Sequence, residues 1–328
     1  MRRQKLYLNN VNLNKMTDSP LKIFTGSSHP ELASEIAKYL RVKVSDMTLT
    51  RFACNEIYVR PEQTVRGCDV FIVQTATSRV NEDLMELFII IDSMKRSFAG
   101  RIHVVMPHFG YARQDRVATP REPISAKLVA NLIAAAGADH VITVNLHSDQ
   151  EQGFFDFPVD NMSAKKLFVA YFEKKKIKDL MVVAPDTGAA KSAKRFADML
   201  GVDLAILHKV RTGHNVSEVT QVIGDVMDRT CLIFDDMIDT GGTVVTGKEA
   251  LIKKGANTEM YLAATHPVFS DPAISRLKTV GFKEVVVTNT IPIPPEKNFN
   301  GLTVISIAPL LAKAIDNVHK ARSVSEVF

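Results

Sequence analysis

The sequence is poor in cysteine, has no tryptophan and contains no long apolar run. Its three cysteines, Cys54, Cys68 and Cys231, stand at irregular spacing that fits neither a disulfide framework nor a zinc knuckle. No stretch approaches the roughly 18 consecutive apolar residues that a membrane span needs. Residues 1–16 are basic and rich in asparagine, without the apolar segment of a secretory signal. These absences exclude a disulfide-stapled scaffold and a membrane partner, and they predict a reducing, cytoplasmic location.

A contiguous basic stripe interleaved with aromatic residues is also missing, although the net charge is +5 and the pI is about 9.0. A positive balance suits nucleic acid, but it equally suits a site that collects phosphate groups. Because the chain also lacks tryptophan as a stacking platform for bases, we expect no nucleic-acid partner.

What the sequence does have is a repeated alternation of short apolar runs and segments with helical periodicity. Most of the runs are β-branched and apolar on both faces, as strands buried on both sides of a parallel sheet must be. Strand, helix and strand at this rhythm predict an α/β fold. The expected strands are residues 21–24, 70–73, 102–106, 141–146, 180–184, 204–207, 231–234, 261–264, 285–288 and 304–307, and the expected helices are 30–40, 82–98, 124–136, 164–174, 191–200, 244–254 and 272–280.

The length allows two doubly wound parallel-sheet domains, with a break expected near residues 157–163. The predicted organisation is a flexible leader over 1–20, an N-terminal α/β domain over 21–162 and a C-terminal α/β domain over 163–328. The first helix is expected to open with a capping box formed by Ser28 and Glu31, with Pro30 in its first turn. Ligands of open parallel sheets lie beyond the carboxyl ends of the strands, so chemistry is expected in the loops that follow them.

The sharpest motif is the segment 232–243, where an apolar strand ends in acids and a glycine-bearing loop precedes a helix. Glycines let the backbone approach a ligand closely, and N–H groups at a helix start favour a phosphate. Carboxylates repel a phosphate, so their natural partners are sugar hydroxyls or a divalent cation. The motif predicts a sugar-phosphate site, and the alternative is a tight turn with helix-capping residues. Its polar and glycine positions are Asp235, Asp236, Asp239, Thr240, Gly241, Gly242 and Thr243.

Two other nucleotide-binding motifs are excluded. Residues 242–248 have Walker A spacing, but Glu249 follows where a serine or threonine is required, and Gly247 would lie inside the helix. No G-x-G-x-x-G follows any expected strand, which excludes a dinucleotide-binding dehydrogenase.

The run Asp-Asp-Met-Ile-Asp-Thr-Gly-Gly-Thr at 235–243 resembles the phosphoribosyl-pyrophosphate loop of type I phosphoribosyltransferases. This version is most similar to that of the class I ribose-phosphate pyrophosphokinases, also called phosphoribosyl-pyrophosphate synthetases, and the likeness runs from residue 21 to 328. The resemblance implies two domains of phosphoribosyltransferase type, the N-terminal one on the ATP side and the C-terminal one on the ribose 5-phosphate side. It further implies transfer of the β,γ-pyrophosphoryl group of ATP to the C1 hydroxyl of ribose 5-phosphate, giving 5-phosphoribosyl 1-pyrophosphate and AMP. The residues at 235, 236 and 239–243 would then bind ribose 5-phosphate.

Residues 108–116 place two arginines, a glycine and aromatic residues after the strand expected at 102–106. Such a loop suits phosphate clamping and base packing, and the alternative is a solvated basic loop. The resemblance implies that Arg113 and Gln114 bind ATP. His147, which by itself fits a structural role, is placed by the resemblance at the ATP phosphates and the metal. Phe52 and Glu56 match the family residues that hold adenine from a neighbouring subunit.

Residues 208–215 place Lys209 and Arg211 ahead of a glycine after another expected strand. An exposed basic hairpin fits, and so does an arm that closes on a transferring phosphoryl group. The resemblance implies that both cations are catalytic. Asp186, before a glycine turn, fits either a helix cap or a metal contact. The resemblance makes Asp186 and His147 ligands of Mg²⁺.

Four positions depart from the family pattern, namely Cys54, Asn145, Ala189 and Ser192. Cys54 replaces an acid near the adenine and Asn145 replaces an acid ahead of the site histidine, which puts nucleotide choice and a second metal site in doubt. These departures keep open a non-catalytic regulatory subunit of the same family, and a phosphoribosyltransferase is a second alternative. The resemblance also implies phosphate as an activator and a homo-oligomer in which dimers build a hexamer.

Overall fold

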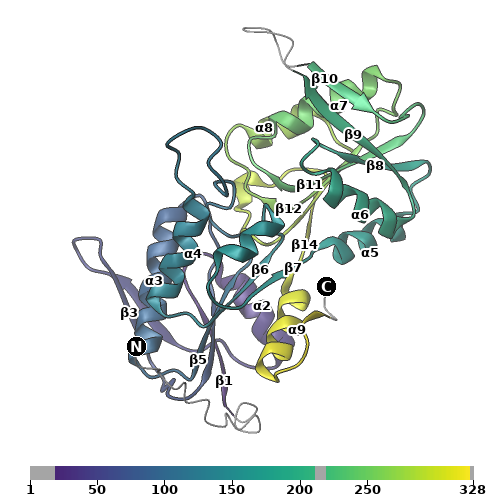
Figure 1. Ribbon diagram of the computed structural model, residues 1–328. Coiled ribbons are helices and arrows are strands. Elements are labelled where there is room, and N and C mark those ends of the chain that lie inside the picture. The colour runs from purple at the N-terminus through teal and green to yellow at the C-terminus, as the bar shows by residue number, and fades with distance from the viewer. Residues whose placement is uncertain (1–18, 211–218, 326–328) are drawn as a thin grey trace, which may run out of the picture.

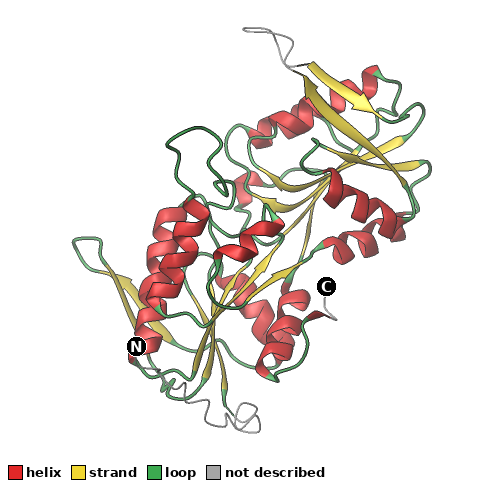
Figure 2. Cartoon of the chain, viewed as in Figure 1, coloured by secondary structure: helices red, strands yellow, loops and turns green. Residues whose placement is uncertain are grey.

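The computed structural model describes residues 19–210 and 219–325, without the side chains of residues 209, 210, 219 and 220. Two sheets dominate it, and helices cover both faces of each (Figures 1 and 2). The predicted architecture of two parallel α/β units is therefore confirmed. Among the described residues, no helix is both long and apolar enough to cross a bilayer.

The first sheet is wholly parallel, in the order β1-β4-β5-β6-β7. Its two faces are covered by different helices because neighbouring residues of a strand point to opposite sides. In β1, Ile23 packs in the cluster that contains α2, whereas Phe24 packs with α3 and α4. The bounds are β1 Leu21–Thr25, β4 Asp69–Val73, β5 Arg101–Met106, β6 His140–Val144, β7 Val159–Met162, α2 Pro30–Leu40, α3 Val80–Arg96 and α4 Ser125–Ala136.

The second sheet has the order β10-β9-β8-β11-β12-β13-β14, and every pairing is parallel except that of β10 with β9. Phe168 of α5 and Phe196 of α6 pack on one face, and Leu251 of α7 and Leu277 of α8 pack on the other. The bounds are β8 Leu180–Ala184, β9 Asp203–Val210, β10 Val219–Ile223, β11 Thr230–Ile238, β12 Tyr261–Pro267, β13 Glu284–Thr288, β14 Leu302–Ile305, α5 Lys165–Lys175, α6 Ala190–Leu200, α7 Gly242–Lys253 and α8 Ala273–Val280.

The last helix, α9 (Ala308–His319), crosses back to the first sheet and packs beside α2 (Figure 1). Its C-terminal His319 lies 2.9 Å from a carboxylate oxygen of Asp69, which opens β4 and is 1% exposed. One buried cluster contains Ile23 and Leu32 from the first unit together with Leu311 of α9. The C-terminal helix α9 therefore packs against the first unit although it follows the second in the sequence. The domain boundary at residue 162 stays a prediction.

Several local expectations need correction. The strand expected to run to residue 146 ends at Val144, because Asn145 adopts a left-handed backbone with φ +45°. Helix α2 is capped by His29, whose Nδ1 accepts the Leu32 N–H, while the Ser28 hydroxyl donates to Gln74 instead of capping. Elements outside the expected set are β2 (Met47–Arg51), β3 (Ile57–Pro61), β7, β10, α9 and the short 3-10 helices η1 (Asp149–Phe154) and η2 (Pro295–Lys297).

Candidate active site

The carboxyl ends of the two sheets face each other along a seam. The ring of His29, after β1, lies 2.9 Å from the carbonyl oxygen of Asn289, after β13. Next along the seam, the Thr75 hydroxyl, after β4, donates to the carbonyl of Thr290 at 2.8 Å. Loops that follow parallel strands in both sheets therefore meet, and this is where ligands of such sheets bind.

Strand β11 delivers two of the predicted acids to the seam. It continues to Ile238 instead of ending at Phe234, so Asp235 and Asp236 lie within the strand. The Asp236 N–H donates to Asp235 Oδ1 at 2.8 Å. Burial, together with the neighbouring Asp236, raises the pKa of Asp235 well above its ordinary value. The two neighbouring carboxyls are thus shifted in opposite directions, Asp235 toward its neutral form and Asp236 toward its ionised form.

The loop after β11 has the backbone of a phosphate cradle. Gly241 has φ +73°, a left-handed conformation that glycine adopts without strain, and it caps the start of α7 with no side-chain hydrogen bond. The Arg276 guanidinium of α8 donates to the Thr240 carbonyl at 3.0 Å, and this hydrogen bond connects the loop to α8. A 12-residue helix starts at Gly242 beside the acids, two residues before the start predicted from the sequence.

The loop after β5 brings the predicted ATP element to the same place. Phe109, 2% exposed, anchors it in the core, and Tyr111 turns the backbone with φ +65°. Arg113 then reaches across the seam, with Nη1 2.5 Å from Asp239 Oδ2. Gln114 is fixed on α4, because its side-chain oxygen accepts the Ser125 hydroxyl at 2.6 Å. Two residues predicted to serve different substrates, Arg113 and Asp239, are thereby brought into contact.

His147 forms a second bridge across the seam, with Nδ1 2.7 Å from Asp236 Oδ2. This hydrogen bond raises the pKa of His147 against the opposing effect of burial. Burial acts to raise the pKa of Asp236, but the hydrogen bonds with His147 and Asp235 and the charge of His147 together outweigh burial, so the net shift is downward. The two side chains form an ion pair between the halves.

Glu151 is a site residue that the sequence reasoning missed. It is 0% exposed, Oε1 accepts the Ser148 N–H at 2.8 Å, and Oε2 has no partner among the described residues. Burial raises its pKa to about 7, with Asp115 and Asp236 adding in the same direction. The Ser148-x-x-Glu151 spacing of a capping box is the signal that could have revealed it.

Asp186 ends up at the carboxyl edge of β8, the sheet neighbour of β11. Its Oδ1 accepts the Ala189 N–H at 2.8 Å, so the helix-start role is present. The charge of Asp186 adds a little to the rise in the pKa of Asp235. No group of three His, Cys, Asp or Glu side chains among the described residues could hold a metal ion alone. Magnesium bound through nucleotide phosphates needs only one or two carboxylates from the protein, and Asp186 can supply one. The role of His147 as a second ligand stays a prediction, because its Nδ1 is taken up by Asp236.

Two predicted residues, Phe52 and Glu56, are not brought to this cluster, and the side-chain positions of two others are not described. Phe52 and Glu56 lie on the hairpin of β2 and β3, beside α3 (Figure 1), where Phe52 is 54% exposed and packs edge-on against Tyr58 at 5.5 Å. Lys209 is in β9, paired with residue 220, and its side chain is not described. Arg211 lies outside the described residues.

Asn145, which departs from the family pattern, has a structural role. Its side-chain oxygen accepts the Ala164 N–H at 2.9 Å, and its carbonyl oxygen lies 3.1 Å from Nε2 of His266, the fully buried histidine at the end of β12. Burial, with the nearby His108 in support, lowers the pKa of His266 to about 3. The contacts of Asn145 with Ala164 and His266 therefore help to join the two sheets.

The rejected Walker A reading is also settled by geometry. Lys248 lies inside α7 and donates from Nζ to the Gly281 carbonyl at 2.6 Å, at the end of α8. Because this lysine is 4% exposed and caps a helix, it is not available to a phosphate.

Residues 21–137 match the family model of the N-terminal domain of ribose phosphate pyrophosphokinase, and residues 211–328 match that of the phosphoribosyl synthetase-associated domain. The ribose-phosphate pyrophosphokinase of Caldanaerobacter subterraneus subsp. tengcongensis is 49% identical over 309 residues, covering 94% of this chain and 98% of that protein. The protein of the same name from Oceanobacillus iheyensis is 46% identical over 311 residues, covering 95% of this chain and 98% of that protein.

A crystal structure of phosphoribosylpyrophosphate synthetase from Mycobacterium smegmatis has a TM-score of 0.88 and 48% identity to this chain, covering 92% of this chain and 100% of that one. Both sheets are thus shared with a solved member, and the identity extends over nearly the whole length. The chain belongs to the ribose-phosphate pyrophosphokinase family, whose members are diphosphate-transferring enzymes.

Proposed function

We propose that this chain transfers the β,γ-pyrophosphoryl group of ATP to the C1 hydroxyl of ribose 5-phosphate, giving 5-phosphoribosyl 1-pyrophosphate and AMP. The observation that carries the proposal is the double bridge across the seam, Arg113 to Asp239 and His147 to Asp236. The loop after β5 of the first sheet, which carries Arg113, here meets the acidic and glycine-bearing loop after β11 of the second sheet. Two substrates bound to these elements would meet at the same place.

In this proposal the loop after β11 holds the sugar phosphate. The start of α7, with Gly241, Gly242 and the threonines at 240 and 243, faces the 5-phosphate. Asp235 and Asp239 would form hydrogen bonds with the ribose hydroxyls. Asp235 would suit both donating and accepting, because burial favours its neutral form, which carries a donor and an acceptor.

ATP would lie on the opposite side, with Arg113, Gln114 and His147 on its phosphates. Arg113 and His147 already carry charge partners in Asp239 and Asp236, and triphosphate oxygens would replace or share those contacts. Mg²⁺, when bound, would neutralise the phosphate oxygens, with Asp186 and His147 as its ligands from the protein.

The reaction is an in-line displacement at the β-phosphorus. A bond forms between the C1 oxygen and the β-phosphorus, and the C1 hydroxyl gives up its proton to water. The bond from the β-phosphorus to the oxygen bridging to the α-phosphorus breaks, with its electron pair leaving on AMP. No covalent protein intermediate is required, so positioning and positive charge supply the acceleration. We assign the charge on the transferring group to Lys209 and Arg211, on the sequence resemblance.

A homo-oligomer is part of the proposal. Phe52 and Glu56 lie on the exposed hairpin of β2 and β3, where Phe52 is 54% exposed, as residues that serve a neighbouring subunit would be. Helix α4 also presents an apolar stripe at four-residue spacing, with Ile124 39%, Leu128 56% and Leu132 41% exposed. Dimers that build a hexamer would cover such a stripe. We further propose that phosphate is an activator. We also propose a cytoplasmic location, which the three unpaired cysteines support.

The proposal is tested by the products that the purified chain forms from ATP and ribose 5-phosphate with Mg²⁺ and phosphate. We expect AMP to form in equal amount with 5-phosphoribosyl 1-pyrophosphate, and Asp239→Asn to reduce its rate at least tenfold. The matched control is Asp92→Asn, which alters an exposed acid paired with Arg96 on α3. Release of pyrophosphate with a base as acceptor would instead favour a phosphoribosyltransferase, and absence of turnover by the folded chain would favour a regulatory subunit.

A further inference from the structure

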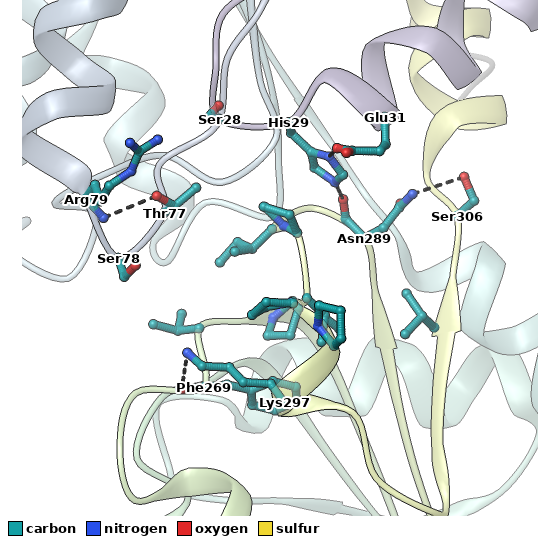
Figure 3. Close-up of a pocket in the computed structure, with 18 of the residues that line it drawn as sticks. Ser28, His29, Glu31, Thr77, Ser78, Arg79, Phe269, Asn289, Lys297 and Ser306 are labelled. Atoms are coloured by element: carbon teal, nitrogen blue, oxygen red, sulfur yellow. Dashed lines mark hydrogen bonds and ion pairs between the residues drawn. The ribbon is translucent and has the colours of Figure 1, made fainter.

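A cavity of about 700 Å³ lies on the seam, away from the cluster of His147 and Asp236 (Figure 3). It opens where β1 and β4 end in the first sheet and where β12, β13 and β14 lie in the second. Helices α2 and α3, which follow β1 and β4, pack on opposite faces of their sheet. The cavity is therefore at a point where the connections diverge, which is where open α/β sheets bind ligands.

One wall of this seam cavity is apolar. Residues 291–295 (Ile-Pro-Ile-Pro-Pro) and the buried Phe269 line it, and in Figure 3 the proline rings lie in the middle of the view between the two labelled polar sides. Proline rings are rigid and the side chain of Ile291 is 5% exposed, so this wall is preformed. A flat apolar body can be bound there without reordering the chain.

Charged side chains of both signs line the cavity, namely Lys297, Arg79, Glu31 and Glu35. Lys297 donates to the Phe269 carbonyl at 2.9 Å and forms no ion pair with any described residue. Across the cavity, the Ser78 hydroxyl has no hydrogen-bond partner among the described residues, and Arg79 has one distant contact, 3.7 Å, with Asp83. An anionic group beside Lys297 would therefore meet a cation that has no ion-pair partner among the described residues, on the side of the cavity opposite Arg79.

The seam cavity is separated from the reaction site but mechanically linked to it. The hydrogen bonds of Thr75 to Thr290 and of His29 to Asn289 close the space between the sheets. The link runs through Phe269, whose N–H donates to the Ile238 carbonyl at 2.9 Å, one residue before Asp239.

The segment that starts at Phe269 leads directly to the sugar-phosphate loop. The Cα of Ala273, at the start of α8, would lie 3.6 Å from a Cβ added at Gly241. A ligand that moves Lys297 or Phe269 would therefore displace the loop at 239–241.

We propose that the seam cavity binds a small planar organic anion, with its charged group beside Lys297 and its ring on the wall of residues 291–295, and that its occupancy changes the affinity of the loop at 239–241 for ribose 5-phosphate. The anion can be a carboxylate or a phosphate or sulfate ester, because the Lys297 ammonium can donate to the oxygens of each. The coupling half of the inference rests on the proposed function, and the binding half does not.

The binding half is tested with 8-anilinonaphthalene-1-sulfonate, a planar anion whose fluorescence reports an apolar environment. We expect saturable binding to the full chain, unchanged by saturating ATP, and weakened by roughly tenfold or more in Lys297→Gln, as loss of one charge-assisted contact implies. Glutamine keeps a donor for the Phe269 carbonyl, so the substitution removes the charge alone. Ile293→Asp, on the apolar wall, is a second variant with the same expectation.

The matched control is Lys313→Gln, an exposed lysine of α9 with no contact to the cavity. Equal affinities in Lys297→Gln and Lys313→Gln would overturn the inference, as would displacement of the probe by ATP. The coupling half is tested by calorimetric titration of ribose 5-phosphate with and without the probe. We expect at least a threefold change in affinity, equal in both directions because linkage is reciprocal.

An unchanged affinity for ribose 5-phosphate, with the probe bound, would overturn the coupling alone. Failure of ribose 5-phosphate to bind the probe-free chain would count against the proposed function, while the fluorescence result would still decide the binding half. The two failures are therefore distinguishable.

Discussion

Replacing the buried Glu151 by glutamine should stabilise the protein above neutral pH and not below pH 4.5. In the folded chain the pKa of Glu151 is raised from an ordinary value of 4.5 to about 7 by burial. Between pH 4.5 and about 7, the Glu151 carboxyl is ionised in the unfolded chain and still protonated in the folded chain. Stability therefore falls as the pH rises through this window, and above pH 7 the loss is complete.

The size of the effect follows from the width of the window. A difference of about 2.5 pKa units corresponds to about 3 kcal/mol at about 1.4 kcal/mol per unit. Glutamine has nearly the same shape, is neutral, and can still accept the Ser148 N–H that Glu151 Oε1 accepts. At an unfolding entropy of about 2.1 cal/mol/K per residue, the gain in Tm is about 4 °C at pH 8.

Thermal unfolding of both proteins, followed by circular dichroism from pH 4.5 to 8, measures this difference. We expect the Tm of Glu151→Gln to equal that of the parent at the acidic end and to exceed it progressively toward pH 8. Glu296→Gln, at an exposed glutamate without a described partner, is the control and should show no such trend. A constant difference across the range, or a lower Tm at pH 8, would refute the inference that Glu151 is a buried carboxyl forced to ionise.

Three further changes test the site. Arg113→Ala should raise the KM for ATP by about tenfold in steady-state assays, while the Tm stays nearly constant because its ion pair is exposed; an unchanged KM would remove Arg113 from the ATP site. Asp236→Asn should lower the pKa of His147, measured by hydrogen exchange at the imidazole carbon, while that of the distant His29 is unaffected. Lys209→Ala should reduce AMP formation by on the order of a hundredfold, as loss of a key charge donor does, and a loss under about threefold would exclude Lys209 from the mechanism.

The central strands could be predicted because they are apolar on both faces. Residues 70–73, 141–144 and 231–234 contain almost nothing that could face water, and all lie inside strands. The hairpin of β2 and β3 and the edge strand β7 were missed because their residues are half exposed and mixed with polar ones, as in Asp160 and Asn161. Helix α9 does follow helical spacing and was open to prediction from its apolar residues.

The candidate site likewise has a part that could be predicted from the sequence and a part that could not. The acids, the glycine turn and the helix start after β11 are local features of one segment, and their arrangement could be predicted from residue type and order. The contacts of Arg113 with Asp239 and of His147 with Asp236 join residues 126 and 89 positions apart. Such contacts depend on how two sheets pack, which the pattern of a single chain does not specify. The burial of Glu151 is of the same kind.

The most direct test of the central claim is the fate of phosphorus when the chain acts on ATP labelled separately in its β- and γ-phosphates, with ribose 5-phosphate present. The account predicts that both labels appear together in the pyrophosphoryl group of the sugar product and that AMP carries neither. Label transferred from the γ-position alone, with ADP as the second product, or both labels recovered as free pyrophosphate, would contradict it.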